Sequence, residues 1–242
     1  MRTLAFVLLA GGLLAACKAE NNVGFIVVQN QVPNAGCIIP AALGTTYRGS
    51  GHLDVGPLPN GAPNPGYLLT PAVRNGAALN QDNPNDNVIV LQGADIELVP
   101  GTTTASESLI STLSGLGLTQ RTQFVSGAVQ PESTAGMSFP VIDADQALAI
   151  ANALGLNEEV TILARVTVFG EIDGAEIVST PFNYPVTVCN GCGWESLGMC
   201  ANVTNDTPVG EGGVCNPLQD GFLSCCTPST GGIRCPASPE ML

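Results

Sequence analysis

The distribution of cysteine constrains this chain more than any other feature. Its 242 residues include nine cysteines, and seven of these lie between Cys189 and Cys235. Cytosolic thiols are kept reduced, so a cysteine content this high favours an oxidising compartment and disulfide bonds. We therefore expect an exported protein whose C-terminal part is cross-linked.

The C-terminal part also has too few large apolar residues to build a sizeable core. After Val188 they are few, and among them are Trp194, Leu197, Leu218, Phe222 and Leu223. A segment of about 50 residues with so small a core needs covalent cross-links to fold stably. The sequence predicts a disulfide-stabilised tail over residues 189–242, with seven cysteines: Cys189, Cys192, Cys200, Cys215, Cys225, Cys226 and Cys235.

The first sixteen residues are typical of an export signal. Arg2 precedes an apolar run, and the small residues Ala15 and Ala16 follow it. The run has roughly 15 residues, which is short for a membrane-spanning helix of about 20. We expect residues 1–16 to be a signal peptide that is removed.

The sequence LAAC at residues 14–17 resembles the lipobox of bacterial lipoproteins. This resemblance implies that the Cys17 thiol carries a diacylglycerol and that cleavage before Cys17 makes it the new amino terminus. Two or three acyl chains hold a protein on a membrane durably, whereas one chain does not. The alternative is an ordinary signal peptide in which Cys17 is incidental, but that would leave an odd number of cysteines in an exported protein.

The residue after the lipobox cysteine bears on location. In Gram-negative lipoproteins an Asp at that position often causes retention in the inner membrane, and here the residue is Lys18. The resemblance therefore implies a lipid-anchored protein of the outer membrane. Residues 17–22 would form a short lipidated tether before the folded domain.

Eight cysteines remain when Cys17 is set aside, which is enough for four disulfides. Seven cysteines of the tail cannot all pair with one another, so one of them needs a partner elsewhere. Cys37 is the only other cysteine of the folded part. We predict that Cys37 links the first strand region to the tail.

Zinc binding and redox chemistry are the alternatives for the tail cysteines. Cys189 and Cys192 have the C-x-x-C spacing of metal ligands, but no second C-x-x-C occurs, and the adjacent pair Cys225 and Cys226 suits tetrahedral coordination badly. A redox pair would be expected to open a helix in an α/β unit, and Cys189 follows a predicted strand. We favour disulfides and predict no metal and no cofactor.

Two further segments carry a resemblance. The run CNPLQDG at residues 215–221, followed by Cys225 and Cys226, and the strand FNYPVTVC at residues 182–189 resemble uncharacterised myxobacterial-type outer-membrane lipoproteins with a Cys-rich C-terminal tail. That group has no assigned function, so the resemblance implies a location and no chemistry.

Residues 23–188 read as a β-rich domain. Its clearest element is a hairpin formed by residues 159–169 and 175–188, with alternating apolar residues and a turn at Asp173-Gly174. Pro181 and Pro185 cannot donate to a sheet ladder, which makes the return strand an edge strand or an irregular one. Eight or nine short strands predict an antiparallel immunoglobulin-like sandwich, with a barrel as the alternative.

Little helix is expected. The run Asp143-Ala144-Asp145 offers an N-cap for a short helix over residues 146–154, and Gly155 would end it. Leu148, Ala151 and Leu154 recur there at helical spacing and are expected on its inner face. Residues 102–119 are small and polar with scattered leucines, and we interpret them as a loop. The sequence thus predicts one short helix.

Charge and residue types exclude some functions. Twenty acidic and seven basic residues give a formal net charge of −13, so the clustered cations that nucleic acid requires are missing. His52 is the sole histidine; Ser50, His52 and Asp54 would share a strand face but are too loosely spaced for a catalytic relay. We interpret His52 as a surface residue.

One acidic loop is a candidate calcium-binding site. Asp82 and Asp86, with neighbouring asparagines, offer the oxygen ligands that Ca²⁺ prefers, but the spacing matches no EF-hand and Pro84 also suits a plain turn. We find no recognisable catalytic set. The expected protein is a lipid-anchored, non-enzymatic envelope component that binds or scaffolds an envelope partner; the alternatives are a periplasmic hydrolase with converging carboxylates and an accessory subunit of an envelope complex.

Overall fold

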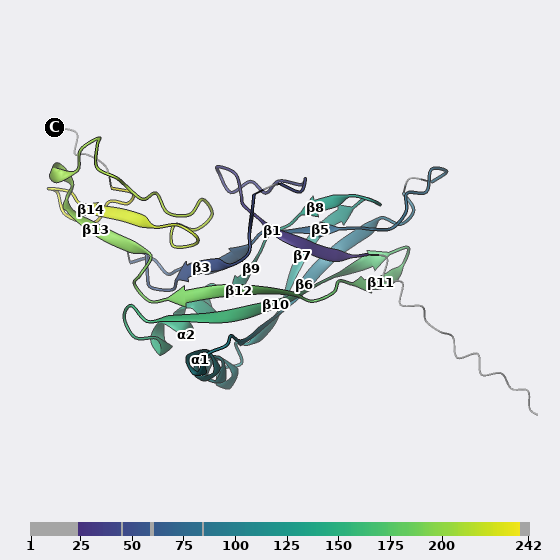
Figure 1. The fold of residues 1–242 in the computed structure, drawn as a ribbon, viewed down its shortest axis with the longest axis horizontal. Helices are drawn as coiled ribbons and strands as arrows, with labels where there is room; N and C mark the ends of the chain where they lie inside the picture. The colour runs from purple at the N-terminus through teal and green to yellow at the C-terminus, as the bar shows by residue number, and fades with distance from the viewer. Residues whose placement is uncertain (1–23, 45, 59–60, 84, 238–242) are drawn as a thin grey trace, which may run out of the picture.

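The protein is mainly β, with several mostly antiparallel sheets, in a computed structural model that describes residues 24–44, 46–58, 61–83 and 85–237. The predicted signal peptide, the lipidation site Cys17 and the tether over residues 17–22 lie outside the described residues. Figure 1 shows an elongated molecule with the tail at one end.

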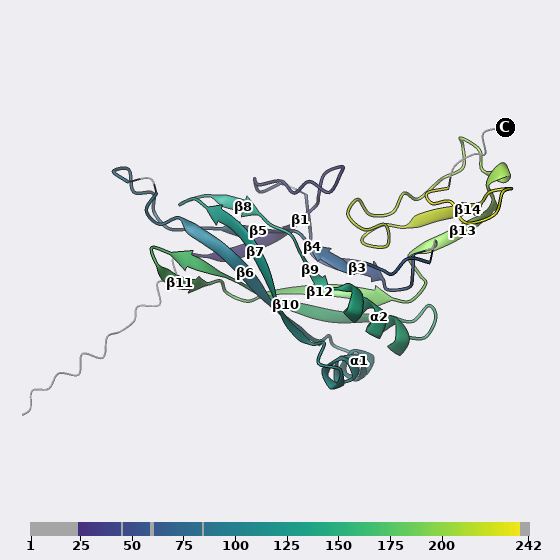
Figure 2. The same cartoon turned by 180° about the vertical axis from the view of Figure 1, so that it is seen from behind.

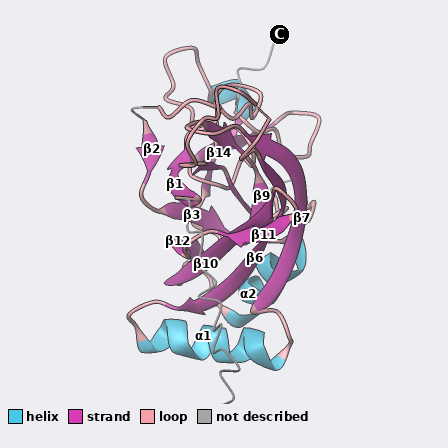
Figure 3. Ribbon diagram, turned by 90° about the vertical axis from the view of Figure 1, so that its right-hand side faces the viewer, coloured by secondary structure: helices cyan, strands magenta, loops and turns pink. Residues whose placement is uncertain are grey.

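The largest sheet is curled into a half-barrel. Its strands follow in the order β3 (Gly51–Asp54), β12 (Phe182–Cys189), β10 (Glu159–Ile172), β6 (Ile89–Pro100) and β7 (Gln120–Val129), and β11 (Ala175–Val178) pairs with the far part of β10. Figure 3 looks along the molecule and shows these strands curving round the core.

The predicted hairpin is confirmed. β10 and β11 meet at Asp173 and Gly174, whose φ angles of 50° and 78° are the positive values that a tight hairpin turn requires. The alternation along β10 places its inner face in the core, where the apolar residues are almost inaccessible: Val160, Ile162, Ala164, Val166 and Val168.

The return strand is irregular, as the prolines predicted, because it breaks into β11 and β12 around Pro181. The sequence pattern of an unbroken return strand places Val178 on the same face as Tyr184 and Val188. The break changes which residues face inward, so that Ile177 is buried and Val178 is exposed. β12 is not an edge strand. β3 pairs with it in parallel from Val186 onward, directly after Pro185.

The expectation of an antiparallel sandwich is therefore wrong where β3 pairs with β12. The tail, for which no strands were predicted, has a second parallel pair, β13 (Trp194–Met199) with β14 (Leu223–Thr227). Local patterns carry no information on strand direction when the partners lie far apart in the chain. In both pairs the direction follows from how distant segments pack.

Two smaller sheets complete the core. One has the order β2 (Tyr47–Arg48), β1 (Ile26–Gln31), β5 (Pro71–Arg74) and β8 (Thr134–Gly136), and the other pairs β4 (Tyr67–Leu69) with β9 (Phe139–Ile142). Buried residues of all these sheets form one hydrophobic cluster, which includes Val73, Phe139 and Val166.

The sequence predicts two strands, over residues 87–91 and 94–99, bent about Gln92 and Gly93 and with Val90 on the buried face. The structure has one strand here, β6, with an irregularity at Gln92. Ile89 and Leu91 face the core before the irregularity, and Ile96 and Leu98 do so after it. Val90 points to solvent, so the predicted buried face was wrong for this part. The reason is that the irregularity shifts the alternation by one residue.

The helix α2 (Ala144–Ala153) confirms the predicted short helix, which begins two residues earlier than expected and has Asp143 as its N-cap. The Asp143 carboxylate accepts a hydrogen bond from the Gln146 backbone N–H, and the Gln146 side chain accepts one from the Asp143 N–H. Ala147 and Ile150 bury the inner face, while Leu148, which we expected on that face, is exposed.

A second helix, α1 (Thr104–Gly115), was predicted as a loop, and this prediction was wrong. Thr103 caps it through the Ser106 N–H, and Leu109 and Leu113 pack against the core. Serine and threonine have weak helix propensity, which hid the helix, but burial of the leucine stripe stabilises it. Figure 3 shows α1 lying across one end of the curled sheet.

The tail is held by its own disulfides and by one to the N-terminal region. Four disulfides are present: Cys37–Cys215, Cys189–Cys192, Cys200–Cys226 and Cys225–Cys235. The predicted link between Cys37 and the tail is among them. Backbone hydrogen bonds from Asp54 N–H to the Leu218 carbonyl and from Asp220 N–H to the His52 carbonyl also join tail and sheet.

Candidate functional site

The pairing of β10, β12 and β3 brings the residues of the candidate site together at the end of the large sheet that lies next to the tail. Glu159 of β10 pairs with Cys189 of β12, and Cys189 pairs with Asp54 of β3. Neighbours in register share a face, and His52 shares the face of Asp54 because it lies two residues earlier. The adjoining residues Leu53 and Val188 point the other way, into the core.

Cys192 completes the group because the chain turns back after β12. The His52 Nε2 atom lies 3.5 Å from the Cys192 Sγ and 3.7 Å from the Cys189 Sγ. Ligand atoms of His52, Glu159, Cys189 and Cys192 all lie within 4.8 Å of one another, and among the described residues they are the one group of this kind with metal-ligating side chains. We call these four residues the Cys–His cluster.

Asp54 fixes the loop between the two cysteines. One carboxylate oxygen accepts hydrogen bonds from the N–H groups of Gly56 (2.8 Å) and Gly191 (2.7 Å), and the other accepts one from the Gly193 N–H (2.7 Å). The residue is fully buried. Because its charge is met by these three donors, Asp54 acts on the cysteine loop and is not available to orient His52.

Asp220 of the tail fixes the other side of the cluster. Its carboxylate accepts hydrogen bonds from the His52 backbone N–H (2.8 Å) and the Tyr67 hydroxyl (2.8 Å), and the Arg48 side chain lies 3.6 Å from it. Burial, followed by the Asp220 charge, raises the pKa of Tyr67 above its usual range. Tyr67 is therefore a neutral hydrogen-bond donor here and no candidate base.

The cluster borders an open groove of about 560 Å³ between the sheet and the tail. Its lining includes Arg48, His52, Glu159, Cys192 and Phe222. The groove gives solutes access to Cys192 and Glu159, whereas Cys189 is fully buried behind them.

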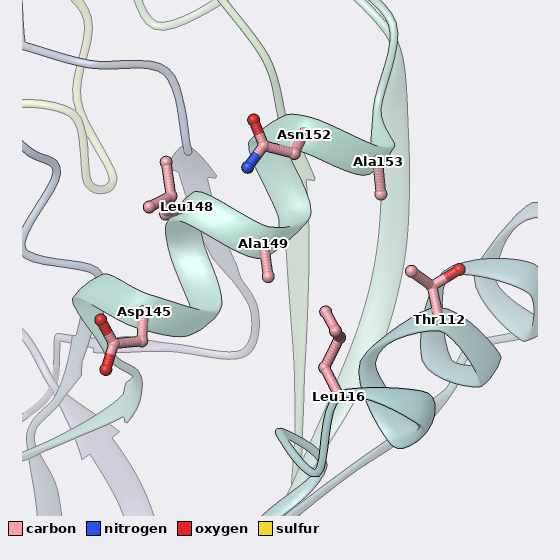
Figure 4. A pocket seen from close by; sticks show the side chains of 7 residues that line it. All are labelled: Thr112, Leu116, Asp145, Leu148, Ala149, Asn152 and Ala153. Carbon is pink, nitrogen blue, oxygen red and sulfur yellow. The ribbon is translucent and has the colours of Figure 1, made fainter.

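A second hollow, of about 390 Å³, lies between the two helices. Figure 4 shows Leu116 of the α1 end and Leu148 of α2 beside it, together with Asp145 and Asn152. The two leucines are 60% and 62% exposed. This surface is largely apolar and has no group suited to catalysis.

The structure does not bring the other sequence candidates together. Asp54 binds backbone N–H groups, so Ser50, His52 and Asp54 form no relay. In the acidic loop, Asp86 accepts hydrogen bonds from Asn80 and Asn83, and Asp82 joins no group of potential metal ligands among the described residues.

His52 and Glu159 are the functional candidates that sequence reasoning missed. His52 was interpreted as a surface residue, and Glu159 as a solvated charge at a strand edge. His52 is instead half-buried beside two sulfur atoms. Only the C-x-x-C spacing signalled the site, because the other two residues come from strands whose pairing is not apparent in the sequence.

Comparison with protein-family models, curated proteins and solved structures gives no match for this chain. In the part of the chain that the structure describes, neither helix has the length and apolar content needed to cross a membrane.

Proposed function

We propose that this chain is a lipoprotein of the bacterial outer membrane, anchored by lipid on Cys17, whose folded part binds or scaffolds another envelope component and is not an enzyme. The four disulfides support export, because such bonds persist in oxidising compartments. The LAAC sequence at residues 14–17 supports the anchor.

The binding role is supported by the positions of the N-terminal strand and the tail at opposite ends of the molecule. The first described residues enter β1 at the end of the molecule that carries β11, and the tail lies at the opposite end (Figures 1 and 2). Eight residues lie between Cys17 and Ile26, where β1 begins, so the two ends of this segment are at most about 30 Å apart. A lipid on Cys17 would thus hold the β11 end near the membrane and present the tail and its groove away from it.

The position of the tail at the far end of the molecule also gives a reason for the disulfide between Cys37 and Cys215. Cys37 joins Cys215 across 178 residues of sequence, so the tail is fastened to the N-terminal strands and cannot separate as a loose module. A rigid distal end suits a docking surface, since less conformational freedom is lost on binding. We further propose that residues 23–188 form an immunoglobulin-like sandwich with the tail at residues 189–242 as a second unit, an assignment supported by the core that the sheets share.

Lipid attachment is tested by expressing the full chain in a Gram-negative host and measuring the mass of its N-terminal peptide. We expect Cys17 at the amino terminus carrying acyl chains, and partition of the protein into detergent. Cys17→Ala should abolish both, whereas Cys37→Ala, which removes a different cysteine, should leave both intact. Membrane attachment that survives Cys17→Ala would refute the anchor.

The binding role is tested by placing a photo-crosslinking residue at Phe222 in the groove or at Val178 on β11, both exposed. In cells that make the anchored protein, we expect a discrete cross-linked envelope partner from position 222 and none from position 178. Cross-links only from position 178, or from neither position, would contradict the proposal.

A further inference from the structure

We propose that the Cys–His cluster is a redox-gated zinc site: when the Cys189–Cys192 disulfide is reduced, His52, Glu159 and the two thiolates bind one Zn²⁺. This inference goes beyond the proposed function and does not depend on the membrane anchor. It starts from the position of one imidazole nitrogen beside two sulfur atoms.

The distances match tetrahedral coordination. Zinc lies about 2.3 Å from a thiolate sulfur and about 2.0 to 2.1 Å from an imidazole nitrogen, so two such ligands on a tetrahedron are about 3.6 Å apart. The observed separations from the His52 Nε2 are 3.5 Å to the Cys192 Sγ and 3.7 Å to the Cys189 Sγ. The imidazole therefore lies within coordination range of both sulfur atoms, which must move apart from each other once the disulfide is opened.

The fourth ligand comes from the neighbouring strand. Glu159 pairs with Cys189 in the sheet, and its carboxylate lies within 4.8 Å of the ligand atoms of the other three residues. Glu159 is exposed and borders the groove, so its carboxylate can turn toward a metal that arrives from solvent. Two thiolates, one imidazole and one carboxylate form a ligand set that zinc favours.

Opening the site requires a dithiol reductant. The dithiol passes two electrons and two protons to the Cys189–Cys192 disulfide, which becomes two thiols while the dithiol becomes a disulfide. Zn²⁺ then replaces the two thiol protons, which leave to solvent as the thiolates coordinate the metal. In the reverse step a disulfide reagent takes two electrons from the two thiolates and two protons from solvent and becomes a dithiol, while the Cys189–Cys192 bond re-forms and Zn²⁺ is released.

Both sides of the cluster are held in place without the disulfide. Asp54 accepts hydrogen bonds from the N–H groups of Gly191 and Gly193, which flank Cys192, and Asp220 accepts one from the His52 N–H. These contacts involve no sulfur atom, so they survive reduction. All three donors are backbone N–H groups, so these contacts hold the backbone at His52 and on both sides of Cys192.

The test uses the full lipoprotein in detergent. The protein is treated with increasing dithiothreitol, freed of reductant without oxygen, and titrated with Zn²⁺, while alkylation and peptide mapping identify the disulfides that opened. We expect one Zn²⁺ per chain when Cys189 and Cys192 are free thiols and none when they are oxidised. X-ray absorption should show two sulfur ligands and two nitrogen or oxygen ligands.

Variants separate this site from unspecific binding to thiols. His52→Ala should weaken zinc binding by about tenfold or more, and Glu159→Gln should weaken it by a smaller factor. Glu158→Gln changes an exposed neighbour outside the cluster, and Cys37→Ser with Cys215→Ser removes a disulfide elsewhere; both should leave the affinity unchanged. His52→Gln serves as a second variant if the alanine protein does not fold.

Three outcomes would overturn the proposal. The first is a reduced chain that binds no zinc, and the second is an unchanged affinity in both His52 variants. The third is a Cys189–Cys192 disulfide that opens only when near-ultraviolet circular dichroism shows that the tertiary structure has been lost.

Discussion

The phenolic oxygens of Tyr67 and Tyr184 lie 3.0 Å apart in the core. Their other hydrogen-bond partners determine which of the two hydroxyls donates to the other. The Asn30 side-chain amide donates to Tyr184, and Tyr67 donates to Asp220, so Tyr184 donates to Tyr67. This chain connects β1, β12, β4 and the tail, and it ends on the carboxylate that also accepts from the His52 N–H.

Removing the Tyr67 hydroxyl should destabilise the protein. Tyr67→Phe leaves the buried Tyr184 hydroxyl without its acceptor and removes one of the donors to Asp220. We expect the free energy of unfolding to fall by about 1 to 3 kcal/mol in urea titrations. Tyr47→Phe, at a 61% exposed position, should change it by less than about 0.5 kcal/mol. Equal stability of the Tyr67 and Tyr47 variants would contradict this network.

The same tyrosines should make the protein sensitive to alkali. Burial is the main cause that raises the pKa of both, and the Asp220 charge adds to it. Below about pH 10 both are neutral in the folded and unfolded states; above it they lose protons only on unfolding. Stability should therefore decrease with rising pH above about 10, by at most about 1.4 kcal/mol per pH unit for each tyrosine.

This alkaline slope is measured by urea unfolding between pH 9 and pH 11. The double variant Tyr67→Phe, Tyr184→Phe should show a smaller slope than the wild type, because two of the ionising groups are gone. Tyr47→Phe should retain the wild-type slope. A double variant with an undiminished slope would show that other groups cause the alkaline loss.

The disulfide between Cys37 and Cys215 should contribute more to the free energy of unfolding than a disulfide within the tail. Its cysteines are 178 residues apart, against 26 for Cys200 and Cys226. In the chain-entropy description, losing the longer loop costs about 5 kcal/mol and losing the shorter one about 3.6 kcal/mol. Paired Cys→Ser variants at each bridge, compared by urea unfolding, should follow that order. The reverse order would mean that local strain or residual structure outweighs loop length.

Two neighbouring glycines should respond differently to the same change. A Cβ on Gly51 would lie 2.4 to 2.5 Å from ring atoms and the hydroxyl of buried Tyr67, whereas one on Gly49 would meet nothing within 4 Å. We expect Gly51→Ala to lower the free energy of unfolding by about 3 kcal/mol and Gly49→Ala to change it by less than about 0.5 kcal/mol. Thermal and urea unfolding would measure both, and similar values for the two variants would exclude close packing of β3 on Tyr67.

The elements that the sequence predicted correctly are those with local causes. Asp173-Gly174 made the hairpin turn recognisable because only a few residues tolerate positive φ. Asp143 and Gln146 cap α2 through contacts three residues apart. By contrast, α1 was missed because its stability comes from packing Leu109 and Leu113 on the core. The composition of this segment, rich in serine and threonine, does not predict a helix.

Half of the candidate site was visible in the sequence and half was not. Cys189 and Cys192 were recognisable from their spacing. His52 and Glu159 were not, since they lie more than a hundred residues apart and meet only because β3, β12 and β10 are adjacent. The parallel pairing of β3 with β12 depends on the tail, whose Asp220 and Leu218 bond to β3.

The sequence by itself determined the β-rich class, the hairpin, the capped helix and the need for disulfides, including the link from Cys37 to the tail. These follow from short-range backbone preferences, side-chain alternation and the parity of the cysteines. Only the tertiary structure decided strand direction, the second helix and the meeting of His52 and Glu159 with the cysteines. Those features depend on which surfaces from distant parts of the chain bury one another. The free energy of that burial depends on both surfaces, so it cannot be inferred from one segment alone.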